Sequence, residues 1–218
     1  MTELKYPLER TAYLLVDPYN DFLSEGGRSW PKLKAIAEEV GLLANLRKLD
    51  RTVRAAGVQV AIVPHRRWEP GDYEHWDHPN PSQRTIMLGH HFARGEWGGE
   101  WHPDFAPKEG DIIASEHWGS SGFANTDLDM RLKQKGITHV IVVGLLANTC
   151  IETTAKYAME LGYHVTLVRD ATAAFGHEQM HAAHDINGRT YAHAIVTSDE
   201  LVGAIEANSS RETLRELV

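Results

Sequence analysis

Six runs of almost unbroken hydrophobic residues are spaced along the chain. Five are clear and the last is weaker: "AYLLVD" (12–17), "VQVAIVP" (58–64), "DIIAS" (111–115), "THVIVVGLL" (138–146), "YHVTLVRDA" (163–171) and "AHAIVT" (192–197). A run that is hydrophobic throughout, rather than at alternate positions, is typical of a parallel strand covered on both faces. We therefore predict a mainly parallel sheet of six strands.

Between these runs, hydrophobic residues recur at spacings of three and four, which predicts helices. One pattern continues from Pro31 to Val53, and another starts at Ile151 and ends at Gly162. Segments 126–136 and 198–207 each begin with a residue suited to capping a helix, and 181–188 continues a helical pattern with a solvated face. The alternation predicts a doubly wound, Rossmann-like α/β fold in one domain over residues 1–218.

The segment from His65 to Glu109 interrupts this alternation. It has no clear hydrophobic period, and it follows the second predicted strand at the edge where open α/β sheets place their ligand crevice. Unstructured segments of this length in compact domains are often functional. We predict a lid or insertion that either lines a substrate site or forms a contact between subunits.

Composition narrows the function classes. The 218 residues are 42% hydrophobic and carry a formal net charge of −8, which disfavours nucleic-acid binding because such surfaces are normally basic. No run approaches the roughly 18 apolar residues of a membrane span, and the charged start "MTELKYPLER" does not resemble a secretory signal. A single cysteine fits a reducing compartment, so we expect a cytoplasmic protein.

That cysteine, Cys150, lies where the fourth hydrophobic run turns into a helix, in "VVGLLANTCIETTAKYAMELG". A buried cysteine is often only a small hydrophobic residue, and a metal site is disfavoured because there is no second thiol. At the start of a helix, however, the free N–H groups and the helix dipole would lower the pKa of the thiol and could hold an oxyanion. A nucleophile and an inert core residue therefore both fit this position.

Asp17 ends the first predicted strand in "AYLLVDPYNDF". If the first and fourth strands are neighbours, Asp17 and Cys150 project into one crevice. The alternative is that Asp17 only caps a turn. Asp21, four residues on, is expected to hydrogen-bond loop backbone.

These segments resemble the isochorismatase-like cysteine hydrolases, a family that includes nicotinamidases, N-carbamoylsarcosine amidases, and ureidoacrylate and biuret amidohydrolases. "LLVDPYNDF" is similar to the family's first strand, and "SGFANTDLDMRLKQKGITHVIVVGLLANTCIETTAKYAMELGYHVTLVRDATAAF" is similar to its central and C-terminal parts. The resemblance covers most of the chain outside residues 65–109.

The resemblance implies an enzyme that hydrolyses small amide, ureido or carbamoyl compounds through a thioester on Cys150. Asp17 would take the thiol proton and pass it to the leaving nitrogen. The backbone N–H groups of Leu146 and Cys150 would hold the oxyanion, and a cis peptide would join Leu145 to Leu146. The family also implies a homo-oligomer, a dimer or tetramer, and we expect this protein to need no cofactor.

The sequence departs from the family at the third catalytic residue, a lysine ahead of "SGF". Here the segment is "DIIASEHWGSSGFANT", which offers His117 at the lysine position, or Glu116 if the alignment shifts by one residue. His117 could form an ion pair with a thiolate, whereas Glu116 would place a second acid near Asp17. Arg66 or Arg67 could also supply the charge, and Tyr19 replaces a glutamine common in the family.

The insertion is rich in histidine and tryptophan. His65, Asp72 and His75 are of types that bind zinc, but the family's Asp-x-His metal motif is incomplete, so we predict no bound metal. Aromatic residues are instead predicted to surround a small polar substrate. The predicted substrate-binding residues are Tyr19, Phe22, Trp68, Tyr73, Trp76 and Trp118.

Two other functions stay open at the level of sequence. An isochorismatase-type enol-ether hydrolase needs an acid rather than a thiol, so Cys150 counts against it. A non-catalytic binding protein is suggested by the missing lysine, and it predicts a Cys150 that does not react with iodoacetamide.

Overall fold

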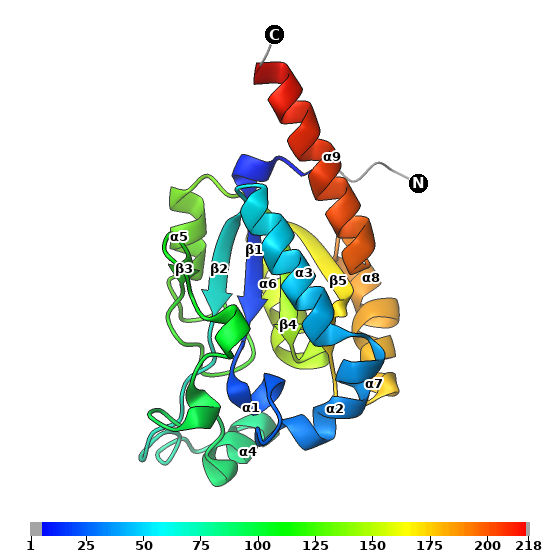
Figure 1. Cartoon of the computed structure of the whole chain (residues 1–218). Helices are drawn as coiled ribbons and strands as arrows, with labels where there is room; N and C mark the ends of the chain where they lie inside the picture. The colour runs from blue at the N-terminus through cyan, green and yellow to red at the C-terminus, as the bar shows by residue number, and fades with distance from the viewer. Residues whose placement is uncertain (1–5, 217–218) are drawn as a thin grey trace.

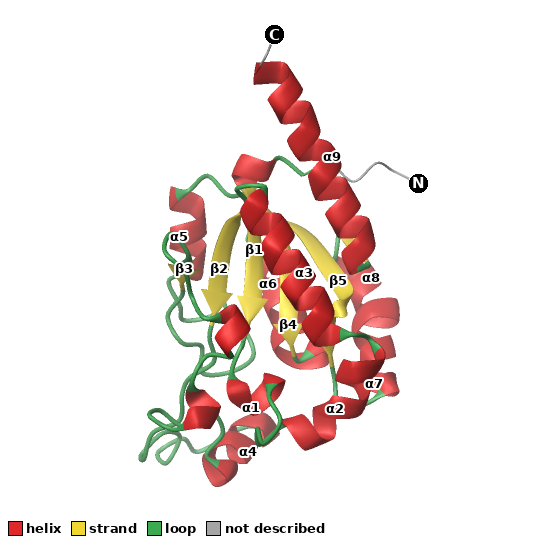
Figure 2. Cartoon of the chain, viewed as in Figure 1, coloured by secondary structure: helices red, strands yellow, loops and turns green. Residues whose placement is uncertain are grey.

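The computed structural model describes residues 6–216, and side chains as far as residue 210. One sheet contains β1 (Thr11–Val16), β2 (Gln59–Val63), β3 (Ile112–Ile113), β4 (His139–Leu145), β5 (His164–Ala173) and β6 (Ala194–Val196). The strand order is β3-β2-β1-β4-β5-β6, and all neighbours are parallel (Figure 2). The predicted doubly wound parallel sheet is confirmed, although β3 is shorter than its hydrophobic run.

Helices cover both faces of the sheet (Figure 1). One face carries α2 (Trp30–Glu39), α3 (Leu42–Ala55) and α9 (Ser198–Glu216), and the other carries α5 (Leu128–Gln134), α6 (Glu152–Glu160) and α8 (Gly188–Tyr191). The remaining helical segments are η1 (Leu8–Arg10), α1 (Asn20–Leu23), α4 (Pro81–Gly89), η2 (Trp97–Gly99), η3 (Pro103–Phe105), η4 (Ala147–Ile151), α7 (His177–His181) and η5 (Ala182–Asn187). Among the described helices, none is both long and apolar enough to cross a bilayer.

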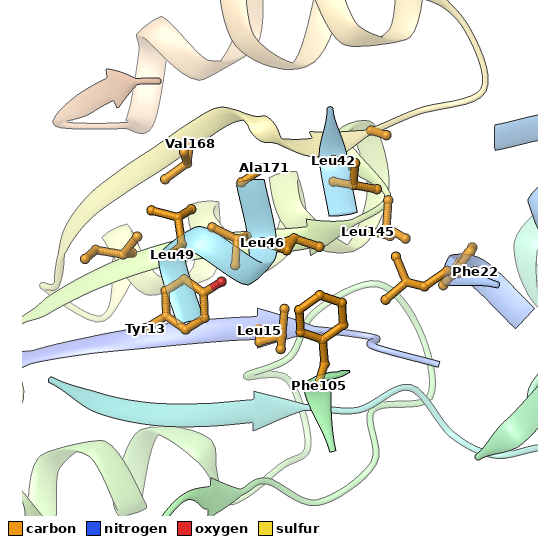
Figure 3. Close-up of a cluster of buried hydrophobic side chains, with 14 of the residues drawn as sticks. Tyr13, Leu15, Phe22, Leu42, Leu46, Leu49, Phe105, Leu145, Val168 and Ala171 are labelled. Atoms are coloured by element: carbon orange, nitrogen blue, oxygen red, sulfur yellow. The ribbon is translucent and has the colours of Figure 1, made fainter. Parts of the chain in front are cut away.

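The core explains the unbroken hydrophobic runs. Every residue of β1 is buried, with Tyr13 and Leu15 facing the α3 side and Leu14 facing the α5–α6 side. Figure 3 shows Leu46 and Leu49 of α3 beside Tyr13 and Leu15 of β1. Because both faces of the strand lose contact with water, neither face tolerates a polar pattern.

Two helical predictions need correction. The pattern from 31 to 53 forms two helices rather than one, because Gly41 adopts φ +69° between α2 and α3, a left-handed conformation that glycine adopts at little cost. In 181–188 the expected solvated face is wrong in part. His184 is buried, and its ring nitrogens lie 3.0 Å from Thr172 Oγ1 and 3.1 Å from the Met180 carbonyl oxygen.

The insertion contains a helix, α4, that its hydrophobic pattern did not reveal. Asn80 and Gln83 form a reciprocal capping box, and Pro81 occupies the first turn, where its missing N–H costs nothing. Asp21 fixes the far end of this segment by accepting hydrogen bonds from the backbone N–H groups of Phe92 (2.7 Å) and Arg28 (2.9 Å). The expectation that Asp21 binds loop backbone is confirmed.

β1 and β4 are neighbours at the point where the strand order reverses, so their carboxyl ends meet in one crevice. Gly144, near the end of β4, has φ +109°, and a Cβ there would lie only 2.2 Å from the Val16 carbonyl oxygen. Only glycine fits this close approach, which brings the end of β4 against the residue that precedes Asp17.

Candidate active site

Asp17 directly follows β1 and is completely buried. Its φ of +55° is left-handed, a conformation that aspartate tolerates better than most residues. Its N–H donates to the Val63 carbonyl (3.0 Å), and its own carbonyl accepts from the Tyr19 N–H (2.8 Å). The chain therefore leaves the sheet through a turn that holds the carboxylate at the strand end.

His117 follows β3 and is also completely buried. Its Nδ1 lies 2.8 Å from the Gly119 carbonyl oxygen, and its Nε2 lies 3.0 Å from Asp17 Oδ1. A carbonyl oxygen only accepts hydrogen bonds, so Nδ1 carries a proton, and a carboxylate at Nε2 favours a proton there too. Burial lowers the pKa of His117, but Asp17 and the Gly119 carbonyl outweigh it and leave the pKa raised. The contacts of both ring nitrogens therefore favour the protonated form of His117.

Cys150 lies in η4, the π-helical turn that leads into α6 and follows the cis peptide between Leu145 and Leu146. Its sulfur, a carboxylate oxygen of Asp17 and a ring nitrogen of His117 all lie within 4.8 Å of one another. The expectation that strands one and four bring Asp17 and Cys150 together is therefore met by the geometry.

The protonation state of Cys150 differs from the expectation. Burial and the negative charge of Asp17 raise the pKa of the thiol well above its usual value, and they outweigh the Thr149 hydroxyl and the Leu146 backbone N–H, which lower it. The expected lowering of the thiol pKa at the helix start is wrong, because burial, and then the charge of Asp17, outweigh the groups that lower it. Within the described part of the chain, Asp17 Oδ2 is buried without a hydrogen-bond partner, so an acceptor for the thiol proton is present.

Glu116 does not join this group. Its carboxylate accepts hydrogen bonds from Arg67 Nε (2.7 Å) and Arg94 Nη2 (2.9 Å), and lies 3.3 Å from Arg66 Nη1. Burial raises the pKa of Glu116, but the hydrogen bonds and charge of Arg67 and the charge of Arg94 lower it by more, so the net shift is downward. The alternatives that placed Glu116, or else Arg66 or Arg67, beside the thiol are therefore wrong. These charged side chains pair with one another outside the cavity lining.

A cavity of about 260 Å³ opens onto the sulfur. The strand ends and the turn at Cys150 provide Asp17, His65, Leu146 and Thr149, while α4 and the residues after it provide a second wall. The full lining comprises Asp17, Phe22, Ser29, His65, Pro81, Ser82, Thr85, Ile86, His91, Phe92, Leu146, Thr149, Cys150 and Phe175. The insertion therefore does line the cavity, through α4.

Of the predicted substrate-binding residues, only Phe22 lies in this lining. Tyr19 is buried outside the lining. Its hydroxyl donates to the His65 carbonyl (2.8 Å), and its ring stacks on Trp101 (4.9 Å between ring centroids). Trp68 stacks on His90 at 3.8 Å between ring centroids. The predicted aromatic wall is corrected, because these rings pack against other parts of the insertion instead of the cavity.

The other three aromatic residues, Tyr73, Trp76 and Trp118, pack on one another, and the Arg66 guanidinium lies 4.7 Å from the Trp118 ring. The capping box of α4 followed by Ile86 was the sequence signal for the real wall.

Of the three residues considered for a metal, two have other hydrogen-bond partners and one is exposed. His65 Nδ1 lies 3.0 Å from the Arg66 carbonyl oxygen, Asp72 binds the Arg66 guanidinium (2.9 Å), and His75 is exposed. Burial, and then the charge on His117, lower the pKa of His65 to about 4. Within residues 6–210, the group with metal-ligand spacing is instead Asp17, His117 and Cys150, side chains of types that zinc also takes.

Residues 11–200 match the family model described as the isochorismatase domain. The chain is similar to the ureidoacrylate amidohydrolase RutB of Yersinia enterocolitica (29% identical over 185 residues, 79% of each protein). It is equally similar to RutB of Agrobacterium fabrum (29% over 206 residues, covering 89% of this chain and 90% of that protein).

Two solved structures extend the likeness. A cysteine hydrolase from Pseudomonas syringae pv. phaseolicola 1448A superposes with a TM-score of 0.78 at 25% identity, covering 94% of this chain and 96% of that one. N-carbamoylsarcosine amidase from Thermoplasma acidophilum gives a TM-score of 0.66 at 28% identity, covering 87% and 97%.

Proposed function

The chain belongs to the isochorismatase family, and from that premise we propose that it is a cysteine-dependent amidohydrolase that cleaves a C–N bond of a small amide, ureido or carbamoyl compound. The observation that carries the proposal is the buried group at the cavity floor. There the Cys150 sulfur, the Asp17 carboxylate and the His117 ring lie within 4.8 Å of one another. The relatives named as amidohydrolases and as an amidase support the same reaction class.

Acylation begins with the thiol. Because the raised pKa keeps Cys150 protonated at rest, Asp17 must take its proton as the sulfur attacks the carbonyl carbon. The S–C bond forms, and the carbonyl oxygen becomes an oxyanion facing the backbone N–H groups of Leu146 and Cys150. Asp17 then gives the proton to the nitrogen. The oxyanion reforms the carbonyl, the C–N bond breaks and an amine or ammonia departs. The acyl group remains on Cys150 as a thioester.

Deacylation uses the same groups in the opposite order. Asp17 takes a proton from water, the hydroxyl adds to the thioester carbonyl, and the C–S bond breaks. The sulfur regains the proton from Asp17, and the acid product leaves.

His117 supplies the positive charge that a lysine supplies in the family pattern. Its imidazolium holds Asp17 Oδ1 at 3.0 Å and leaves Oδ2 free to exchange the proton with sulfur. It also offsets the negative charge that develops between sulfur and substrate in a buried site, where electrostatic interactions are strong.

A screen of small amides, ureas and carbamates, scored by ammonia or amine release, tests this function. We expect Cys150→Ala to abolish release, and mass spectrometry of the intact protein to detect an acyl adduct on the native enzyme only. Turnover by Cys150→Ala equal to that of the native protein would refute the mechanism, and an adduct-free native enzyme would favour an enol-ether reaction.

We also propose that the enzyme needs no cofactor, acts in the cytoplasm and assembles as a homo-oligomer. Large exposed hydrophobic side chains, among them Leu88, Met130 and Trp97, support the last point. Light scattering after size-exclusion chromatography tests it directly.

A further inference from the structure

We propose that this cavity accepts uncharged amides or ureides and discriminates against substrates that carry a carboxylate. The inference rests on the proposed function and specifies its substrate class. It follows from the charges of the cavity wall and from what holds the neighbouring arginines.

Among the described residues that line the cavity, none is lysine or arginine, and the one anionic group is Asp17. The two histidines of the wall are neutral near pH 7, since burial is the main factor that lowers the pKa of both His65 (to about 4) and His91. The imidazolium of His117 is already paired with Asp17 at 3.0 Å. A carboxylate in this cavity would lose its water without gaining a cation, which is strongly unfavourable.

The nearby arginines are committed to other partners. Arg66, Arg67 and Arg94 surround Glu116. On the side of His91, Arg28 binds Glu96 (2.6 Å) and lies 3.6 Å from Asp21. Lys32, which also faces His91, is exposed, so water screens its charge.

The neutral part of the wall indicates what the substrate presents instead. Phe22, Phe92 and Phe175 give it apolar surface, and Ser82 and Thr85 place hydroxyl groups along one side of α4. These surfaces fit an apolar or hydroxylated group on the far side of the scissile bond. The compounds in the names of two relatives, ureidoacrylate and N-carbamoylsarcosine, are both carboxylates. The proposed uncharged substrate therefore differs from them in charge.

The single cysteine offers a direct test, because iodoacetamide and iodoacetate differ in charge and alkylate the same sulfur. We would measure both alkylation rates on the full chain by mass spectrometry and divide their ratio by the ratio for free glutathione. We expect Cys150 to prefer iodoacetamide by at least roughly tenfold beyond glutathione, because the iodoacetate charge enters beside Asp17. Thr85→Arg, which adds a cation to the wall, should remove most of that preference.

Leu88→Arg is the matched control. It adds the same charge to the same helix, but Leu88 is 78% exposed and outside the lining, so the preference should stay. Equal normalised rates for the two reagents, or the same effect from both arginine variants, would overturn the inference and leave the amidohydrolase proposal intact. A Cys150 that neither reagent alkylates would contradict the proposed function itself, and the substrate inference with it.

Discussion

The chain segments that leave β2 and β3 run side by side, and each places one histidine at the edge of the sheet. His65 and His117 form a parallel backbone bridge, their ring centroids are 4.9 Å apart, and both are almost completely buried. Their protonation is nevertheless opposite. The pKa of His65 is lowered to about 4, whereas that of His117 is raised.

The hydrogen-bond partner of the ring explains the difference. Burial lowers the pKa of both histidines, but His117 Nε2 meets the Asp17 carboxylate, whereas His65 Nδ1 meets only the Arg66 carbonyl. The charge on His117 then lowers the pKa of His65 further. Two equally buried histidines thus provide one fixed cation beside the thiol and one neutral ring on the cavity wall.

Removing the cation should have the largest effect. We expect His117→Gln to lower kcat/KM by about 10²–10³-fold, because glutamine can still hold Asp17 but cannot offset the charge in the transition state. Steady-state kinetics on the substrate found in the screen measures this. His181→Gln, an exposed histidine outside the cavity lining, is the control and should keep full activity. An unchanged rate in His117→Gln would remove the histidine from the mechanism.

His117→Lys, which restores the lysine of the family pattern, should distinguish the effect of the positive charge from the effect of the imidazole shape. Because the pKa of His117 is raised, the ring keeps its proton to higher pH than an ordinary histidine and loses its charge as the pH rises through that pKa. We therefore expect native kcat/KM to fall on the alkaline side. In His117→Lys, partial activity should return and the fall should move to higher pH, since lysine titrates near 10.4. If native protein and variant share one alkaline limb, that limb belongs to another group.

The sequence was sufficient to predict the half of the site that depends on strand order. Asp17 and Cys150 each follow a long buried run, and in a parallel sheet the ends of neighbouring strands meet at one edge. The segment ahead of "SGF" also offers His117 at the lysine position of the family. The sequence could not decide against Glu116, because both residues follow β3 and the choice depends on the distant arginines that bind Glu116.

The cavity wall was harder to predict, for a physical reason. Trp68, Tyr73 and Trp76 look like binding residues in a sequence, but apolar rings in a long loop also satisfy themselves by packing on one another. The residues that reach the cavity, such as Thr85 and Ile86, are ordinary helix residues. Only the tertiary position of α4 gives them a role, and a local pattern does not contain that position.

His65, the neutral histidine of the pair, should affect the free energy of unfolding at acid pH. His65 has a folded-state pKa of about 4, below its ordinary value of 6.5, so the unfolded chain binds more protons between these values and stability falls as pH drops through that window. The loss should approach about 3 kcal/mol near pH 4. We expect urea unfolding of His65→Gln to show a shallower loss between about pH 7 and about pH 5.

His164→Gln is the comparison for that measurement. The pKa of His164 is also lowered to about 4, again chiefly by burial, but its site at the opposite end of the sheet is more open to solvent. Its substitution should therefore change the pH slope less than that of His65. Parallel slopes for native protein and His65→Gln would show that His65 is not buried in its neutral form.

The smallest effect is expected at the residue beside His117. Glu116 and His117 are adjacent, yet Glu116 faces Arg66, Arg67 and Arg94 rather than the sulfur. Glu116→Gln keeps the shape of the side chain and removes only its charge, so kcat/KM should stay within about threefold while stability falls by about 1–2 kcal/mol as the arginines lose their common partner. Kinetics and urea unfolding on the same preparation test both halves. A loss of activity matching that of His117→Gln, at unchanged stability, would instead place the carboxylate of Glu116 in the reaction.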